Sequence, residues 1–196
     1  MKWKFSALLL CACLVPMAQA RDKNKTPLPD ACGDENAKFD VKLQSNPSAS
    51  LTPDPGKALI VFIDQTQHFK EVIRFAIDGT WVGANYGNSY FTVAVAPGEH
   101  NLCGAFQRSG DKARSLSGMT NFTAEAGKIY YWESVIGNLN YQLAAVPADA
   151  ASLPGPSTPP RSVGNGVIYV SYRFLTEQQG KYALKTSELA GSSPKK

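Results

Sequence analysis

Short apolar runs separated by turns that contain glycine or proline recur between residues 37 and 174 of this chain. The clearest turn is Asp78-Gly79, which lies between the runs Val72–Ile77 and Thr80–Gly83. Asp-Gly between two apolar runs predicts a β-hairpin, because a type I′ turn needs positive φ at both central residues and glycine adopts it without steric cost. Many short strands joined by such turns predict an all-β fold, an antiparallel β-sandwich.

Two patterns of burial are expected among these strands. Ala37–Leu43 alternates apolar with polar residues, which predicts a half-buried strand. Lys57–Asp64 holds an uninterrupted apolar run and predicts a strand that is buried on both faces. Further strands are expected at Tyr90–Val95, Glu99–Gln107, Ser115–Glu125, Ile129–Ile136, Tyr141–Val146 and Val167–Phe174.

One short C-terminal α-helix is also expected. Thr176, with Gln179 three residues later, forms a capping-box pattern that opens a helix from about Glu177 to Leu189. Gly180 lies inside this helix, where a glycine costs about 1 kcal/mol relative to alanine. Residues 191–196 are expected to form a flexible tail.

The first twenty residues have the layout of a secretion signal. Lys2 and Lys4 precede an apolar run, and Ala18 and Ala20 stand where a signal peptidase requires small residues. A membrane anchor is the alternative, but it needs about 20 apolar residues, and Pro16 interrupts this run. We therefore expect a signal peptide over residues 1–20 and an exported product, either periplasmic or secreted.

A lipid anchor is a second possibility for the same segment. Leu10-Cys11-Ala12-Cys13 places leucine and alanine where a lipoprotein signal peptidase favours them, which would attach lipid to Cys13. The residue before Ala12 is a cysteine, however, and the apolar run ahead of Cys13 is short. Lipid anchoring at Cys13 therefore stays an alternative.

The cysteines predict one disulfide. Cys11 and Cys13 leave with the signal peptide, so the mature chain keeps Cys32 and Cys103. Two cysteines in an oxidising compartment are expected to pair. Closing a loop of about 70 residues should stabilise the fold by about 4 kcal/mol.

The remaining chain suits a single domain with loose ends. Residues 21–31 are polar and contain proline, which predicts a disordered lead-in. The β-sandwich domain is expected over residues 32–190, with a proline-rich loop at 147–166 inside it. Removing residues 1–20 lowers the formal charge from +4 to +2. So small a charge argues against a nucleic-acid partner.

Aromatic side chains are the candidate binding residues. In the strand Ile129–Ile136, Tyr130 and Trp132 lie on one face and Tyr131 lies on the other. If one face is exposed, Tyr130, Trp132 or Trp81 could stack on a sugar or a partner protein. Alternatively, a helix or a loop covers that face, and the C-terminal helix is a candidate.

No catalytic or metal-binding motif is found in the sequence. His100 follows Pro97-Gly98-Glu99, where a ring nitrogen is expected to bond a nearby carbonyl, and His68 lies in a polar loop. Neither histidine has a metal-ligand spacing. Asp30, Asp34 and Glu35 surround Cys32 but lack the register of a calcium loop. We therefore expect no cofactor and no metal.

Several motifs in their order along the chain are similar to those of one family. They are Gly56–Phe62, Ile77–Gly79, Ser89–Phe91, Pro97–His100 and Ala126–Tyr131. Together they resemble the bacterial domain of unknown function 2846 family, and the same pattern resembles PEGA domains, which are surface-associated β modules. The resemblance implies an exported or envelope-associated β domain of bacterial origin, without an established activity.

Three functions remain open at the level of sequence. The first is an exported, non-catalytic β-sandwich module of the bacterial cell envelope that acts through protein or surface contacts. The second is a glycan-binding module that uses exposed aromatic residues. The third is a hydrolase whose site has no sequence motif.

Overall fold

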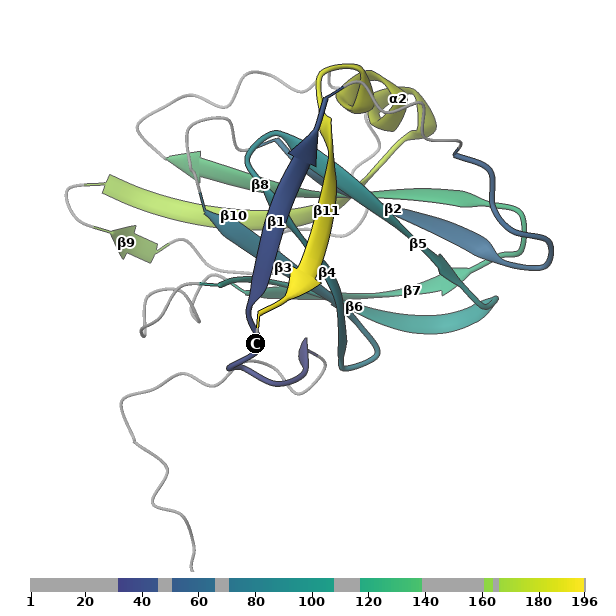
Figure 1. The fold of residues 1–196 in the computed structure, drawn as a ribbon, viewed down its shortest axis with the longest axis horizontal. Helices are drawn as coiled ribbons and strands as arrows, with labels where there is room; N and C mark the ends of the chain where they lie inside the picture. Colours follow the sequence, from purple (N-terminus) through teal and green to yellow (C-terminus); the bar gives the residue numbers. More distant parts are fainter. Residues whose placement is uncertain are drawn as a thin grey trace, which may run out of the picture.

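Two β-sheets packed face to face form the fold of this protein, seen here in a computed structural model (Figure 1). The structure describes residues 32–45, 51–65, 71–107, 117–138, 161–163 and 166–195. The sequence prediction of an all-β sandwich with one short C-terminal helix is confirmed over these residues. The predicted signal peptide, the lead-in at 21–31, the strand Tyr141–Val146 and loop residues 147–160 lie outside them.

The larger sheet contains seven strands among the described residues, and the smaller contains four. In spatial order the larger sheet is β1 (Phe39–Gln44), β11 (Glu188–Pro194), β5 (Ser89–Val95), β2 (Ala58–Asp64), β8 (Ile129–Asn138), β10 (Gly166–Leu175) and β9 (Arg161–Val163). The smaller is β4 (Thr80–Tyr86), β3 (Val72–Ile77), β6 (Gly98–Phe106) and β7 (Gly118–Ala124). Most neighbours are antiparallel, whereas β11 with β5 and β2 with β8 are parallel.

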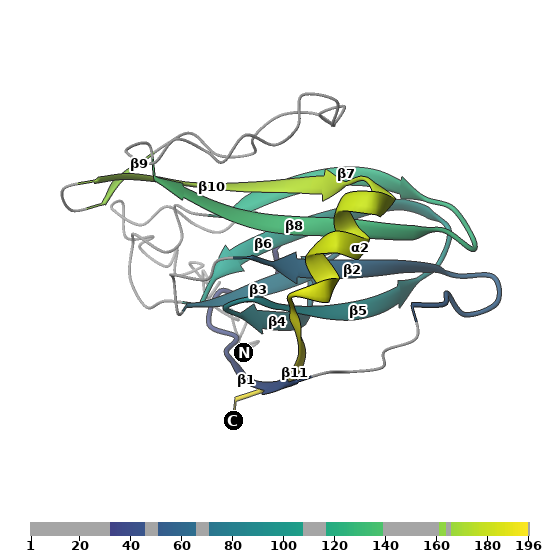
Figure 2. The same cartoon turned by 90° about the horizontal axis from the view of Figure 1, so that it is seen from above.

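Strand β2 is buried along its whole length, as its continuous apolar sequence predicts. Its even-numbered side chains enter the main core between the two sheets, where Phe62 stacks on Phe91 with ring centroids 4.9 Å apart. The rings of Trp132 and Phe62 form a T-shaped pair with centroids 5.7 Å apart. The odd-numbered side chains of β2 enter a second core beneath helix α2 (Glu177–Lys185). Figure 2 shows this helix lying across the outer face of the larger sheet.

The predicted hairpin at Asp78-Gly79 is present and joins β3 to β4. Both turn residues have positive φ, 50° at Asp78 and 77° at Gly79. These values are those a type I′ turn requires, and aspartate and glycine are among the residues that adopt them at low cost.

The end of the chain differs from its prediction. The capping box at Thr176 and Gln179 is confirmed, but the helix ends at Lys185 rather than near Leu189. Residues 188–194 then form β11, between β1 and β5, so the prediction of a flexible tail at 191–196 was wrong for residues 191–194. The strand forms because Ala190 is buried in the main core and its backbone pairs with β1 along six residues. The predicted loop at 147–166 likewise contains strand β9.

Gly180 has a packing role in helix α2. A Cβ atom at this position would lie 2.2 Å from the ring of Tyr131, on the strand below. The absence of a side chain therefore lets the helix lie directly on the buried Tyr131 ring. This contact accounts for a glycine that is otherwise unfavourable inside a helix.

We predict that Gly180→Ala destabilises the protein, although alanine is the better helix former. Overpacking of this kind costs about 1–3 kcal/mol, which outweighs a helix-propensity gain of about 1 kcal/mol. Urea unfolding followed by circular dichroism measures the change. Gly191→Ala is the matched control, because its added Cβ would meet its nearest atom at an ordinary 3.7 Å. Equal or greater stability of Gly180→Ala would contradict the packing argument.

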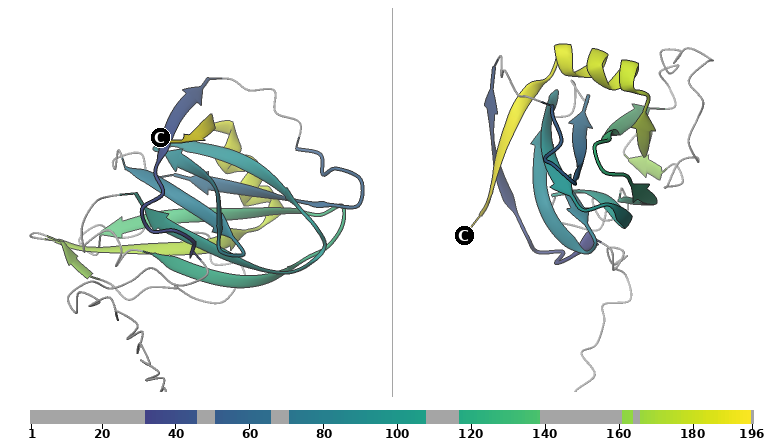
Figure 3. Two further views of the ribbon diagram at one scale, coloured as in Figure 1. Left: turned by 60° about the horizontal axis from the view of Figure 1, so that its bottom comes forward. Right: turned by 90° about the vertical axis from the view of Figure 1, so that its right-hand side faces the viewer.

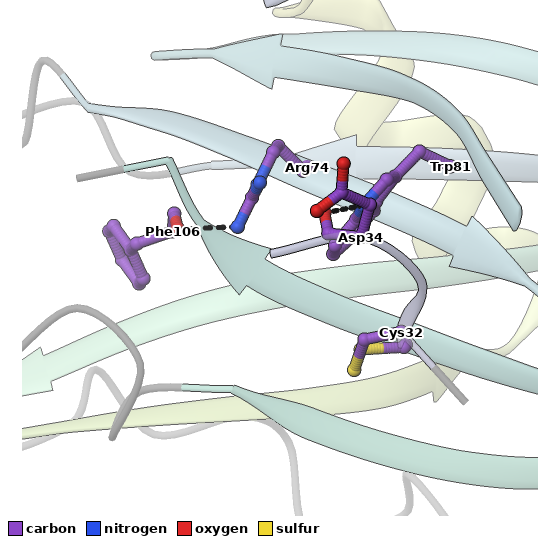
Figure 4. The surroundings of a disulfide bond; sticks show 6 residues. Cys32, Asp34, Arg74, Trp81 and Phe106 are labelled. Carbon is purple, nitrogen blue, oxygen red and sulfur yellow. Dashed lines mark hydrogen bonds between the residues drawn. A yellow bond between two sulfur atoms is a disulfide. The ribbon is translucent and has the colours of Figure 1, made fainter. Parts of the chain in front are cut away.

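The predicted disulfide between Cys32 and Cys103 is present, and both cysteines are fully buried. Cys103 lies on β6, so the bond fixes the segment Cys32–Ala37 on the outer face of the smaller sheet (Figure 4). On the same segment, the Asp34 carbonyl accepts a hydrogen bond of 2.6 Å from the Trp81 indole. Arg74 donates to the carbonyls of Glu35 and Ala37. We call this segment the N-terminal clasp.

We predict that removing the disulfide in a Cys32→Ala/Cys103→Ala variant lowers the free energy of unfolding by about 2–5 kcal/mol. The bond spans 71 positions of the sequence, so its loss frees a long loop in the unfolded chain. Alkylation of the unfolded, unreduced chain beginning at Arg21, followed by mass spectrometry, should detect no free thiol. A chain that alkylates at either cysteine would show that the bond does not form.

Candidate functional site

The three aromatic residues predicted from sequence do not form one surface. Trp81 lies on the smaller sheet, where the Arg74 guanidinium sits 4.4 Å from the centre of its ring. Tyr130 and Trp132 lie on the larger sheet and face the main core. Trp132 is 0% exposed, so the prediction that it could stack on a ligand was wrong. The smaller sheet, rather than the helix, covers that face of β8.

Trp81 has two partners within the protein. Arg74 lies over one face of its ring, and its indole nitrogen donates to the Asp34 carbonyl. Arg74 is buried beside it and donates to the carbonyls of Phe106, Glu35 and Ala37. Burial lowers the pKa of Arg74, and the charges of Asp34 and Glu35 partly offset this effect. The Arg74–Trp81 pair therefore holds the N-terminal clasp against the sheet, and a sugar cannot use that ring face.

Tyr130 belongs to a cleft on the side of the sandwich where β7 faces β8 and β10. Phe122, Tyr130 and Phe174 are half-buried there, and Trp132 and Tyr172 lie beneath them. The Phe122 ring is 5.1 Å from that of Tyr130 and 5.3 Å from that of Phe174. The hollow has a volume of about 250 Å³. We call this site the aromatic cleft.

Strand β7 borders the aromatic cleft with one of its two edges. It is the last strand of the smaller sheet and pairs only with β6 among the described strands (Figure 3). The Tyr130 hydroxyl donates to the Thr123 carbonyl and accepts from the Glu125 N–H, at 3.3 and 3.0 Å. In a strand, alternate residues turn their backbone groups to the same side. The N–H and C=O groups of Asn121 and Met119 therefore also lie on the open edge.

A second and larger hollow lies on the outer face of the larger sheet, between helix α2 and strands β8 and β10. Its volume is about 1060 Å³. Glu133 and Arg173 line one wall, and helix residues that include Lys181, Tyr182 and Lys185 line the other. We call this site the helix groove. Sequence reasoning did not single out these residues, because their positions depend on where the helix lies on the sheet.

Glu133 and Arg173 form an ion pair inside the helix groove. The Arg173 Nε donates to Glu133 Oε2 at 2.8 Å, and the Glu133 side chain is only 3% exposed. Burial raises the pKa of Glu133, and the nearby Arg173 charge partly counteracts this. The buried carboxylate therefore holds the Arg173 guanidinium through its Nε.

His100 has a structural role that resembles its sequence prediction. Its Nε2 lies 2.8 Å from the Ala96 carbonyl, and its Nδ1 lies 2.7 Å from Asp78 Oδ2. Because both partners are acceptors, the ring satisfies them best when both nitrogens carry protons. The contacts join the Asp78-Gly79 turn to the turn that precedes β6. His68 lies outside the described residues.

The electrostatics of this pair favour its charged form. Burial acts to lower the pKa of His100, but the Ala96 carbonyl and the Asp78 carboxylate outweigh it, so the pKa is raised. For Asp78, burial acts to raise the pKa, but hydrogen bonds from the Asn101 N–H and from His100 outweigh it, so the pKa is lowered.

We predict that the stabilisation by His100 weakens as the pH rises. Since its pKa is raised above 6.5, its contribution is complete below that pH and is lost as the pH passes the raised value. The contribution of Asp78, whose pKa is lowered from 3.8, is instead present above that pH and is lost in acid.

Urea unfolding of wild type and His100→Gln, from about pH 5 to about pH 9, tests the histidine. The difference in free energy of unfolding between the two proteins should shrink across this range. Asparagine tolerates positive φ, so Asp78→Asn should keep the turn. Its free energy of unfolding should lose the same pH dependence as that of His100→Gln. A constant difference between wild type and His100→Gln would contradict the prediction.

Among the described residues, no three His, Cys, Asp or Glu side chains gather as metal ligands would. Asp30, one of the three acidic residues considered for calcium, lies outside those residues. In the same part of the chain, no helix has the length and apolar character needed to cross a bilayer.

Comparison with known proteins gives no relative. None of the protein-family models, curated proteins or solved structures compared with this chain matches it. The resemblance to the domain of unknown function 2846 family therefore stays a prediction.

Proposed function

We propose that this chain is an exported, non-catalytic β-sandwich module of the bacterial cell envelope that binds an extended segment of another protein. The observation that carries the proposal is the outer edge of β7 beside the aromatic cleft, which pairs with no other strand among the described residues. An extended peptide can add to such an edge through its backbone, while a neighbouring pocket selects its side chains.

The geometry of the edge suits this mode of binding. A peptide paired with β7 would turn every second side chain toward the sandwich interior, where Phe122 and Phe174 lie half-buried. The Tyr130 hydroxyl already forms hydrogen bonds with the Thr123 carbonyl and the Glu125 N–H on this edge. The added strand would therefore pair with Met119 and Asn121.

Export and the lack of catalysis are parts of the same proposal. Export is supported by the signal pattern at residues 1–20 and by the Cys32–Cys103 disulfide, since such bonds persist in oxidising compartments. A non-catalytic role is supported by His100, whose two ring nitrogens are both held by structural partners.

We predict that peptides selected from a random display library on the mature chain have alternating apolar residues and bind the β7 edge. Asn121→Pro removes one backbone N–H from the open edge and leaves the ladder to β6 intact, so it should weaken binding by about tenfold or more. Phe122→Ala should also weaken peptide binding, because it removes an aromatic ring from the aromatic cleft. Fluorescence anisotropy of labelled peptides measures both effects.

Asn121→Ala is the matched control, because it alters the same side chain but keeps the backbone donor. It should bind the selected peptides as wild type does. Failure to enrich any peptide, or equal affinities for wild type and Asn121→Pro, would refute binding at this edge.

A further inference from the structure

The helix groove has the size and the wall chemistry of a binding site for a polar ligand. Its volume of about 1060 Å³ is slightly above the range of small-molecule sites, about 300–1000 Å³. It lies on the outer face of the larger sheet, whereas the aromatic cleft lies between the sheets. The two hollows therefore lie on opposite faces of β8 and β10, although Arg173 and Leu175 border both.

One wall of the groove presents an exposed aromatic ring. Tyr182 is 70% exposed, the largest exposure of any large apolar or aromatic side chain among the described residues. Gly180 and Ala183, on the buried side of the helix, hold α2 against the sheet, which keeps Tyr182 on the groove side. A tyrosine has an apolar ring and a hydroxyl group that stays in contact with water. It therefore suits a ring-shaped ligand with an apolar face and polar groups around its edge.

The opposite wall presents a fixed guanidinium. Arg173 is held by the buried Glu133 at 2.8 Å through Nε, and its side chain is 38% exposed. Its terminal nitrogens have no hydrogen-bond partner among the described residues, and they can donate to hydroxyl or carboxylate oxygens. An aromatic ring can stack on the face of a pyranose, and a planar guanidinium can donate hydrogen bonds to its oxygens. Tyr182 and Arg173 supply these two groups.

The charges in the groove favour an acidic ligand over a neutral one. Two of its cations are paired inside the site, Arg173 with Glu133 and Lys181 with Glu177. Lys185, also in the lining, has no acidic partner within ion-pair distance among the described residues. The lining therefore carries one excess positive charge.

We propose that the helix groove binds an acidic oligosaccharide. Tyr182 stacks on the face of one sugar ring, Arg173 donates to its oxygens, and Lys185 attracts the carboxylate. This glycan site is distinct from the surface made by Trp81, Tyr130 and Trp132, whose rings are buried or already have partners in the protein.

Isothermal titration calorimetry of the mature chain tests the proposal with two probes, tetragalacturonate as the acidic sugar and chitotetraose as the neutral one. The acidic sugar should bind more tightly. Tyr182→Ala should weaken its binding by about tenfold or more, and Tyr182→Phe should retain it. Lys185→Gln should reduce the preference for the acidic sugar.

Met119→Ala, which alters an exposed residue on β7, is the control that should leave sugar binding unchanged. Asn121→Pro should also leave it unchanged, which separates this site from peptide binding at β7. Thermal unfolding of each variant confirms that it is folded. Absence of tetragalacturonate binding, an unaltered affinity of Tyr182→Ala, or equal binding of the two sugars would overturn the proposal.

Discussion

The burial of β2 on both faces is the constraint on which the architecture depends. Every residue from Ala58 to Asp64 is buried, so one covering layer cannot be enough. The smaller sheet covers the even-numbered side chains, and helix α2 covers the odd-numbered ones. The helix is therefore a third layer of the fold, and Gly180 and Tyr131 provide the close contact that lets it serve as one.

Adjacent residues of β8 and β10 serve two different surfaces. On β8, Tyr130 and Trp132 face the sandwich interior, and Glu133 faces the helix groove. On β10, Phe174 faces the interior and Arg173 faces the groove. Because side chains alternate along a strand, the same two strands contribute to an apolar cleft and to a charged groove. The two proposed binding sites thus share a rigid support.

Much of the fold could be predicted from the sequence because its strongest signals are local. The Asp78-Gly79 turn, the apolar run of β2 and the capping box at Thr176 each depend on a few neighbouring residues, and all are present. Strand β11 was missed because its residues, Glu188–Pro194, include Gly191, Ser192 and Ser193 and have no strand-like alternation. Its position is set by pairing with the distant strands β1 and β5.

The candidate sites were less predictable because exposure is a tertiary property. Both faces of β8 carry aromatic rings, and nothing local tells which layer covers each. Trp132, considered as a ligand-stacking residue, is fully buried, whereas Tyr182 is exposed because the buried side of the helix is set by Gly180 and Ala183. The partner of Trp81 is Arg74, on the neighbouring strand of the hairpin.

The N-terminal clasp also determines how a pulling force would enter the domain. The covalent bond from Cys32 ends on β6, an inner strand of the smaller sheet with hydrogen-bonded neighbours on both sides. Tension on the residues before Cys32 would therefore pass directly to that inner strand instead of peeling β1 from the edge of the larger sheet.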